Sequence, residues 1–418
     1  MLRGREDMIR NIRFFMCLVL IIAFLTACVG PYITPKIDRH PLANNFSFIN
    51  PHPTPPSKYD SNSENPFQND YRSSNLSALD LSQSLDGLLF SDFDSKTTWP
   101  VVEKLPMGFN PQLIMELGKD PGLGVRQLHA QGITGSGIGI AIIDLPMLVD
   151  HQDYVSQLKL YEEINIKPST KSEMHGPAVA SIAVGKTVGV APGADLYFIA
   201  DYWGTFTGDG GFDIDLSYLA KAVRRIIEIN QSLPLKHKIR VISISTGWLP
   251  EMKGYADMEA AVAEAKIAGI FVVSMNIDWT YGWKMMGMGR GALADPNDFN
   301  SYTPSPWWSQ AFYDDTNRFS PDFLLIPMDA RTTASPTGTS DYVFYGVGGM
   351  SWTAPYVAGI YALACQIYPE ITPEIFWSTA LQTGRTIQIE HSGQQFPFGI
   401  ILDPHALIVA LQGLRRAQ

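Results

Sequence analysis

Apolar residues in the middle of the chain occur in short runs that alternate with amphipathic stretches. The short runs, which are typical of strands buried on both faces, occupy residues 138–144, 195–200, 239–245 and 270–275. Helical patterns of apolar positions occupy residues 176–185, 216–230 and 258–268. Strands that alternate with helices at this spacing indicate a parallel sheet. The sequence therefore predicts an α/β fold, a doubly wound and mostly parallel sheet with helices on both faces.

A longer apolar stretch begins near the C-terminal third of the chain, where Gly349 and Ser351 precede an almost uninterrupted run of apolar residues to Ile367. A helix that is apolar all round is buried. Pro355 falls in the expected first turn, where the missing N–H costs little. Ser351 would therefore lie where the unpaired N–H groups of a buried helix converge, an end that favours a developing anion. An N-cap serine on a core helix explains the same residues equally well.

Residues 278–322 are rich in Trp, Gly, Met and Asn and show no clear periodicity. A long irregular stretch inside a compact domain is usually functional or disordered. We therefore expect no regular elements there.

The N-terminus has the features of an export signal. Four arginines precede an uncharged run of 12 residues from Phe14 to Leu25, which is too short to span a bilayer comfortably. The following Thr26-Ala27-Cys28 completes a Leu-Thr-Ala-Cys sequence that resembles a bacterial lipobox. We expect residues 1–27 to be a lipoprotein-type signal peptide and Cys28 to carry the lipid, so that the protein is exported and anchored to the bacterial cell envelope. Ordinary cleavage nearby, with Cys28 incidental, is the alternative.

Residues 28–108 are rich in Pro, Ser and Asn and predict a flexible tether. Apolar residues between Leu76 and Phe93 could form a short helix or dock part of the tether on the body. The remaining residues, 109–418, form the predicted folded domain.

Charge and cysteine content limit the partners. The formal net charge of the chain is −10, and residues 1–27 carry +2, so the remainder is close to −12. This charge argues against nucleic acid as a partner and against electrostatic adhesion to anionic lipid, so membrane attachment should come from the lipid on Cys28. The only other cysteines are Cys17 in the signal and Cys365 in the buried helix, so the fold must be stable without disulfides.

Polar residues follow three of the predicted strands. Asp144, Ser245 and Asn276 stand at the ends of their strands, and ligands of parallel sheets bind beyond the carboxyl ends. His175 stands at the start of a predicted helix, as Ser351 does. A serine hydroxyl needs a base to take its proton, and a carboxylate can fix the tautomer of a histidine base. Each residue also has a structural explanation as a turn or capping residue.

Together these segments resemble the subtilases, the subtilisin-like serine peptidases, over roughly residues 122–381. Residues 137–144 with His151 to Tyr154 look like the aspartate motif of the family, and His175-Gly176 followed by Val179-Ala180 looks like its histidine motif. Residues 189–194 are similar to the segment that follows the histidine motif, and Gly349 to Gly359 resembles the serine motif. Three motifs in the same order make a chance match improbable.

The resemblance implies a role for each residue. Asp144 would orient the base, His175 would be the general base and Ser351 the nucleophile. Asn276 would supply a side-chain N–H to the oxyanion, and a protein or peptide substrate would pair with Ser245-Thr246-Gly247. No cofactor is implied. Residues 109–418 would be the peptidase domain, and we predict no dedicated folded inhibitor domain in the residues before it.

The motifs also depart from the family pattern. Pro146 stands in place of a glycine, and Pro177-Ala178 in place of Thr-His. Met350 replaces a threonine, Trp352 is unusually bulky, and the glycine expected before Asn276 is absent. These departures leave open a catalytically weak or inactive binding module at the cell envelope.

A hydrolase acting on other acyl substrates with the same triad is a third possibility, although Gly-x-Ser-x-Gly is absent.

A loop carrying Asp209, Asp213 and Asp215 lacks the spacing of an EF-hand and is interpreted as a solvated loop. No metal site is assigned, and the sequence leaves structural calcium open.

Overall fold

The computed structural model describes residues 34–45, 52–61, 63, 65–207, 211–315 and 322–417. The predicted signal peptide and Cys28 lie outside the described residues. The residues from Lys36 onward form one compact unit. No helix in the described part of the chain combines the length and apolar character needed to cross a bilayer.

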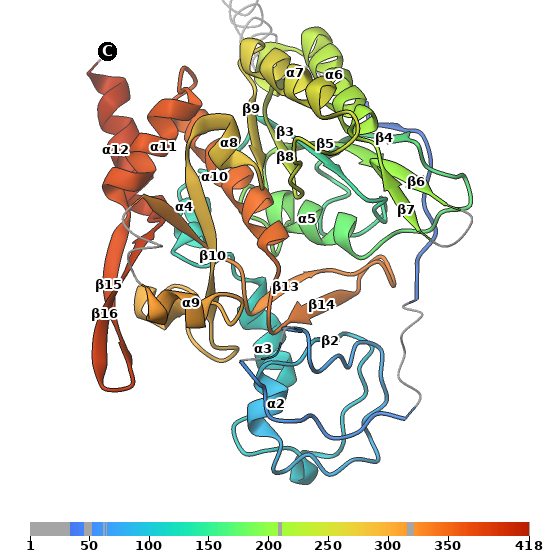
Figure 1. The fold of residues 1–418 in the computed structure, drawn as a ribbon, viewed down its shortest axis with the longest axis vertical. Coiled ribbons are helices and arrows are strands. Elements are labelled where there is room, and N and C mark those ends of the chain that lie inside the picture. The colour runs from blue at the N-terminus through green and yellow to red at the C-terminus, as the bar shows by residue number, and fades with distance from the viewer. Residues whose placement is uncertain are drawn as a thin grey trace, which may run out of the picture. The chain divides into compact units, whose positions relative to one another are not determined.

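A six-stranded parallel sheet organises the body (Figure 1). Its strands, in spatial order, are β1 (Lys36–Ile37), β4 (Leu158–Ile164), β5 (Asp195–Asp201), β3 (Gly139–Asp144), β8 (Ile239–Ile244) and β9 (Phe271–Ser274). Strands β3, β5 and β9 are buried along their whole length, as their continuous apolar runs predict. The predicted parallel α/β sheet is confirmed.

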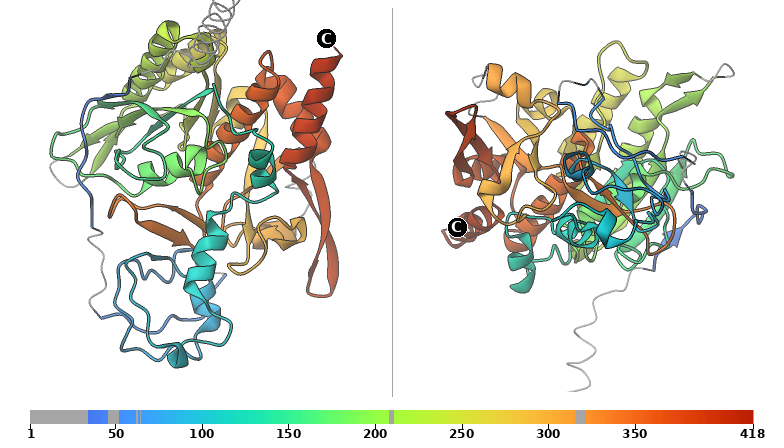
Figure 2. Two further views of the ribbon diagram at one scale, coloured as in Figure 1. Left: turned by 180° about the vertical axis from the view of Figure 1, so that it is seen from behind. Right: turned by 90° about the horizontal axis from the view of Figure 1, so that it is seen from below.

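Helices cover both faces of this sheet (Figures 1 and 2). One face carries α5 (His175–Val184) and α10 (Thr353–Ile367), and the other carries α6 (Leu216–Ser232) and α7 (Tyr255–Ile267). Alternate residues of each strand serve the two layers: Ile142 packs in the layer of α5 and α10, and Ile143 packs in the layer of α6 and α7. Helix α10 is buried on every side through Cys365, in agreement with its apolar sequence.

A second, mixed sheet lies at the C-terminal end of the body. Its order is β11 (Tyr302–Pro304), β10 (Lys284–Arg290), β12 (Phe323–Pro327), β16 (Gln394–Ile401) and β15 (Arg385–His391). It is accompanied by α8 (Ile277–Tyr281), α9 (Ser309–Asp314), α11 (Pro373–Thr383) and α12 (Pro404–Arg416). Smaller elements are α3 (Pro111–Lys119), α4 (Val125–Ala130), η1 (Val102–Lys104), η2 (Leu235–His237), η3 (Phe299–Ser301) and the hairpin of β6 (Gly204–Phe206) with β7 (Phe212–Ile214).

The expectation of no regular elements in residues 278–322 is wrong. Strand β10 lies in this stretch and pairs in parallel with β12, which follows it by more than thirty residues. Gly287 allows this strand to approach Met328 closely, because a Cβ at Gly287 would lie 2.3 Å from the Met328 sulfur. The strand exists because of partners distant in the sequence, and its own residues show no alternation that would reveal it.

The chain before the body is packed rather than free. We call residues 65–110 the N-terminal segment. Its short helix α2 (Leu85–Leu89) and strand β2 (Phe93–Asp94) accompany a core of buried side chains: Tyr71, Leu76, Leu81, Leu88, Phe93 and Phe109. Strand β2 extends the hairpin of β13 (Arg331–Ala334) and β14 (Tyr342–Tyr345). The possible docking that the sequence left open thus involves most of this segment, where a flexible tether was expected.

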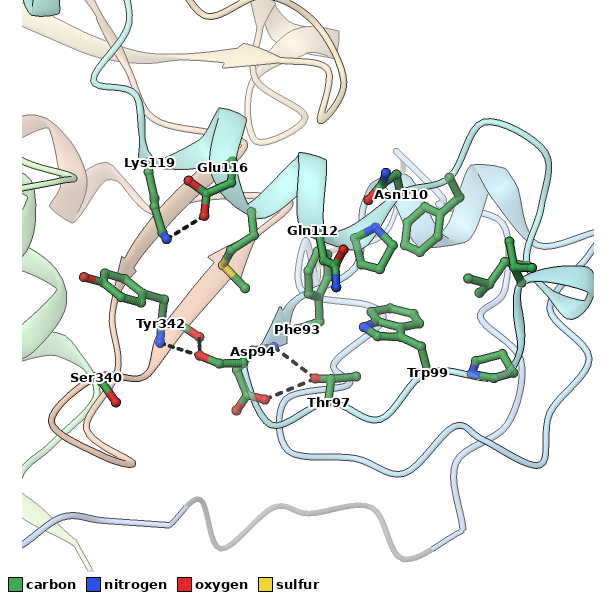
Figure 3. A pocket seen from close by; sticks show the side chains of 17 residues that line it. Phe93, Asp94, Thr97, Trp99, Asn110, Gln112, Glu116, Lys119, Ser340 and Tyr342 are labelled. Atoms are coloured by element: carbon green, nitrogen blue, oxygen red, sulfur yellow. Dashed lines mark hydrogen bonds and ion pairs between the residues drawn. The ribbon is translucent and has the colours of Figure 1, made fainter.

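The physical reason is that the segment shares its core with the body. Phe93 packs against Phe344 with ring centroids 5.0 Å apart, and Ile114 and Ala330 lie in the same cluster. Burying a large apolar side chain contributes about 1.5–3 kcal/mol, so several such side chains offset the ordering of a Pro- and Ser-rich chain. Figure 3 shows the cavity of about 710 Å³ between this segment and α3, with Trp99 and Lys119 among its lining side chains.

Candidate active site

The structure brings the predicted residues to the carboxyl edge of the parallel sheet. Asp144 is the last residue of β3, Ser245 follows β8, and Asn276 follows β9. His175 is the first residue of α5, and Ser351 lies in η5 (Met350–Trp352), a single turn that leads directly into α10. The sheet and its two buried helices therefore converge on this edge.

Asp144 and His175 form a hydrogen-bonded pair. Asp144 Oδ1 lies 2.7 Å from His175 Nδ1 and also accepts the backbone N–H of Leu145 at 2.8 Å. A proton on Nδ1, donated to this carboxylate, leaves Nε2 as the basic nitrogen. Burial by itself lowers the pKa of His175, but the charge of Asp144 and its hydrogen bond outweigh burial and raise this pKa above its ordinary value.

Ser351 and His175 line one cavity of about 540 Å³. The Ser351 hydroxyl donates to the backbone carbonyl of Ser245 at 3.3 Å, and the Ser245 hydroxyl donates to the carbonyl of Ser351 at 2.9 Å. The nucleophile candidate is therefore fastened to the end of β8, the strand expected to receive the substrate backbone.

The departures from the family pattern fit without closing this cavity. Trp352 is buried, and its ring tilts by 37° against the imidazole of His175 at 5.5 Å. The Met350 sulfur lies 3.2 Å from the backbone nitrogen of Gly287 on β10. Pro177 is the third residue of α5, where no intrahelical N–H bond is lost.

Close approach explains the glycine after His175. A Cβ at Gly176 would lie 2.2 Å from the carbonyl oxygen of Leu145. The first turn of α5 therefore touches the chain directly after Asp144, and this contact permits the short bond between Asp144 and His175. The unusual Pro146 takes part in the same contact, since its carbonyl accepts the N–H of Glu173 at 2.8 Å.

Asn276 is buried and its amide contacts the backbone of Trp248 with both polar atoms. The side-chain oxygen accepts the Trp248 N–H at 2.7 Å, and the nitrogen Nδ2 donates to the Trp248 carbonyl at 2.6 Å. The second hydrogen on Nδ2 is not needed for these bonds. The oxygen also sits against Gly247, where a Cβ would approach it to 2.6 Å. Asn276 therefore fixes the end of the Ser245-Thr246-Gly247 stretch.

The described residues contain no group of three or more His, Cys, Asp or Glu side chains that could hold a metal ion. Of the acidic loop, Asp209 lies outside the described residues. Asp215 caps α6, with its Oδ1 accepting the Ser217 N–H, and its carboxylate also pairs with Lys253 at 2.7 Å. Its carboxylate is thus already engaged.

Sequence reasoning missed one wall of the cavity. Phe67, Asp70, Arg72 and Asp92 of the N-terminal segment line it together with His175 and Ser351. Nothing in the local sequence identifies these residues, because their position depends on how the segment docks.

The central part of the chain matches a known protein family. Residues 135–275 match the model of the Subtilase family. The fold is subtilase-like. The match supports a serine peptidase of this type, since it spans β3 through β9 and includes Asp144 and His175.

Individual relatives cover less of the sequence. The Subtilisin-like protease PopC of Myxococcus xanthus (strain DK1622) is 32% identical over 85 residues, which are 18% of this chain and 18% of that protein. The aligned region therefore spans under a fifth of this curated relative.

Among solved structures, the Prenylagaramide maturation protease PagA aligns with a TM-score of 0.46 and 17% identity, covering 69% of this chain and 99% of that chain. MycP1 with the N-terminal propeptide removed aligns with a TM-score of 0.43 and 16% identity, covering 69% and 98%.

Proposed function

We propose that the protein is a serine endopeptidase in which Ser351 attacks the scissile carbonyl. The observation that carries the proposal is the Asp144–His175 hydrogen bond of 2.7 Å beside a cavity that His175 shares with Ser351. His175 Nε2 takes the hydroxyl proton of Ser351 and later returns it to the leaving amine, while Asp144 stabilises the imidazolium. Water then hydrolyses the acyl-enzyme by the same proton route.

Two donors are proposed for the oxyanion. One is the backbone N–H of Ser351, at the N-terminal approach to α10. The other is the second amide hydrogen of Asn276. The substrate backbone would lie extended along Ser245-Thr246-Gly247 and add a strand to the sheet edge. The two hydrogen bonds between Asn276 and the Trp248 backbone support this arrangement because they hold that edge in place.

The decisive test is labelling by a fluorophosphonate probe together with peptide hydrolysis. The wild-type protein should react, and mass spectrometry should locate the adduct on Ser351. Ser351→Ala should lose labelling and hydrolysis while keeping its unfolding temperature, because the bond that the Ser351 hydroxyl donates to the Ser245 carbonyl is long, at 3.3 Å. Wild-type protein that is folded and still unreactive would refute the peptidase.

One observation favours the alternative of a weak or inactive binding module. The Ser351 hydroxyl donates to the carbonyl of Ser245 instead of to His175. Catalysis requires this hydroxyl to exchange that partner for Nε2 of His175. Binding of a peptide ligand that is equal in wild type and Ser351→Ala, without hydrolysis, would establish the module.

We further propose that the protein is exported and anchored to the bacterial cell envelope by lipid on Cys28. The basic and apolar sequence before Cys28 supports this, and the acidic remainder of the chain offers no electrostatic attraction to anionic lipid. Two or more acyl chains give stable anchoring. Cys28→Ser should move the protein from the membrane fraction to the soluble fraction, and unchanged fractionation would disprove the anchor.

A further inference from the structure

The cavity beside Ser351 has one wall that the N-terminal segment supplies. Phe67, Asp70 and Arg72 of this segment face a space that His175 and Ser351 also line. Its volume of about 540 Å³ lies in the range of pockets that bury a ligand group. A segment outside the predicted peptidase domain therefore contributes to the surface next to the reacting atoms.

The segment is fastened to the chain that leads into Ser351. The Asp92 carboxylate accepts the backbone N–H of Gly346 at 3.0 Å. The backbone of Asp92 in turn holds the loop that carries the wall, because its carbonyl accepts the N–H of Tyr71 and its N–H donates to Asn69. Asp92 therefore connects the loop that forms this wall of the cavity with the chain that leads into Ser351.

Two of the aromatic side chains that line the cavity, Phe67 and Trp307, are half-exposed, whereas Tyr345 and Trp352 are buried. Phe67 packs edge-to-face on Trp307 with centroids 5.6 Å apart, and the indole N–H of Trp307 donates to the carbonyl of Gly348 at 2.7 Å. Phe67 and Trp307 are still 46% and 47% exposed. An apolar group entering the cavity would cover these two half-exposed rings, which is a favourable transfer from water.

The polar end of the cavity carries little unbalanced charge. Arg72 makes a two-pronged contact with Asp70, at 2.9 Å and 2.6 Å. Burial raises the pKa of Asp92 to about 8, so this carboxyl is mostly uncharged at neutral pH. A charged substrate side chain would find these groups already paired or neutral, whereas an apolar one meets Phe67 and Trp307.

The cavity lies on the side of the leaving group. His175 must return its proton to the leaving amine, so the leaving half of the peptide lies beside the imidazole. The acyl half is expected along Ser245-Thr246-Gly247, and none of these three residues lines the cavity. The side chain directly after the scissile bond is therefore the group that enters.

We propose that the N-terminal segment, through Phe67 packed on Trp307, builds a subsite that selects a large apolar side chain immediately after the scissile bond. This inference rests on the proposed peptidase function. Differences of hydrophobic fit in a pocket change kcat/KM by about 10–200-fold. We expect the wild type to prefer Phe or Leu over Ser and Asp at this position by at least about tenfold.

The test uses full-length protein and a series of internally quenched peptides that differ only in the residue after the cut. Phe67→Ala should reduce the ratio of kcat/KM for Phe over Ser by about fivefold or more, since one of the two half-exposed rings is lost. Phe67→Tyr keeps the ring and should retain the preference. Phe90→Ala is the matched control, because Phe90 belongs to the same segment, is 37% exposed, stacks on Tyr59 and does not line the cavity.

The outcomes distinguish failure of the subsite proposal from failure of the peptidase proposal. An unchanged ratio in Phe67→Ala, or an equal fall in Phe90→Ala, overturns the subsite while the peptidase stands. Absence of fluorophosphonate labelling on Ser351 in folded wild-type protein refutes the peptidase, and the subsite with it.

Discussion

Replacement of Asp144 by asparagine tests the proposed mechanism at its most defined contact. The carboxylate is 1% exposed and lies 2.7 Å from His175 Nδ1. Asparagine preserves the volume but removes the charge that stabilises the imidazolium. Two unit charges about 4 Å apart interact by roughly 4 kcal/mol at an effective dielectric of about 20. This corresponds to a fall in kcat of about 10³-fold, and a wrong tautomer can extend the loss to roughly 10⁴-fold.

The pH profile gives an independent reading of the same change. His175 acts as a base only when neutral, so kcat/KM rises with pH through its pKa. In the wild type Asp144 raises this pKa against the effect of burial. In Asp144→Asn burial acts without that charge, so the acidic limb of the profile should move to lower pH.

The Asp144–His175 pair should stabilise the fold most at acidic pH, where the peptidase activity is lowest. A raised pKa of His175 means that the pair stabilises the fold fully below the ordinary histidine value of 6.5, and that this contribution is lost as pH rises through the folded value. The unfolding free energies of wild type and Asp144→Asn should therefore differ most at acidic pH and converge as pH rises. Urea unfolding across this range measures the difference.

A second Asp–His pair provides the control. Asp195 begins β5, at the opposite edge of the sheet, and its carboxylate lies 2.5 Å from His237 Nδ1. Asp195→Asn removes a comparable contact without touching the cavity, so kcat and its pH profile should stay unchanged. An Asp144→Asn enzyme that keeps kcat within about tenfold of wild type, or whose acidic limb moves to higher pH, would refute the reasoning.

Two further changes test the oxyanion and the docked segment. Asn276→Ala should lower kcat by about 10²–10³-fold with little change in KM, because an oxyanion donor acts in the transition state. A kcat within about threefold of the wild-type value (about 0.7 kcal/mol) would mean that Asn276 only holds the backbone of Trp248 and does not contact the oxyanion. Phe93→Ala should lower the free energy of unfolding by about 3–5 kcal/mol, since Phe93 is 1% exposed between Trp99, Phe109 and Phe344. Urea unfolding checks the second value, and a change under about 0.5 kcal/mol, typical of a surface residue, would mean that the segment is not packed in solution.

The parallel sheet and the order of the candidate residues along the chain could be predicted from the amino-acid sequence. Short continuous apolar runs are typical of strands buried on both faces, so β3 and β5 could be found without a structure. Asp144, Ser245 and Asn276 stand at or just beyond the ends of predicted strands, and strand ends of a parallel sheet meet at one edge. Helix α10 was equally clear, because all of its faces are apolar.

The surroundings of these residues, in contrast, depend on contacts between parts of the chain that lie far apart in the sequence. Strand β10 and the N-terminal segment owe their order to partners far away in the chain, β12 in one case and Phe344 in the other. The amide of Asn276 engages Trp248, a contact that no local pattern encodes. Phe67 reaches the cavity of Ser351 only because the segment docks through Asp92 on Gly346. Local periodicity reports burial within one element, whereas the surroundings of the site arise from long-range packing.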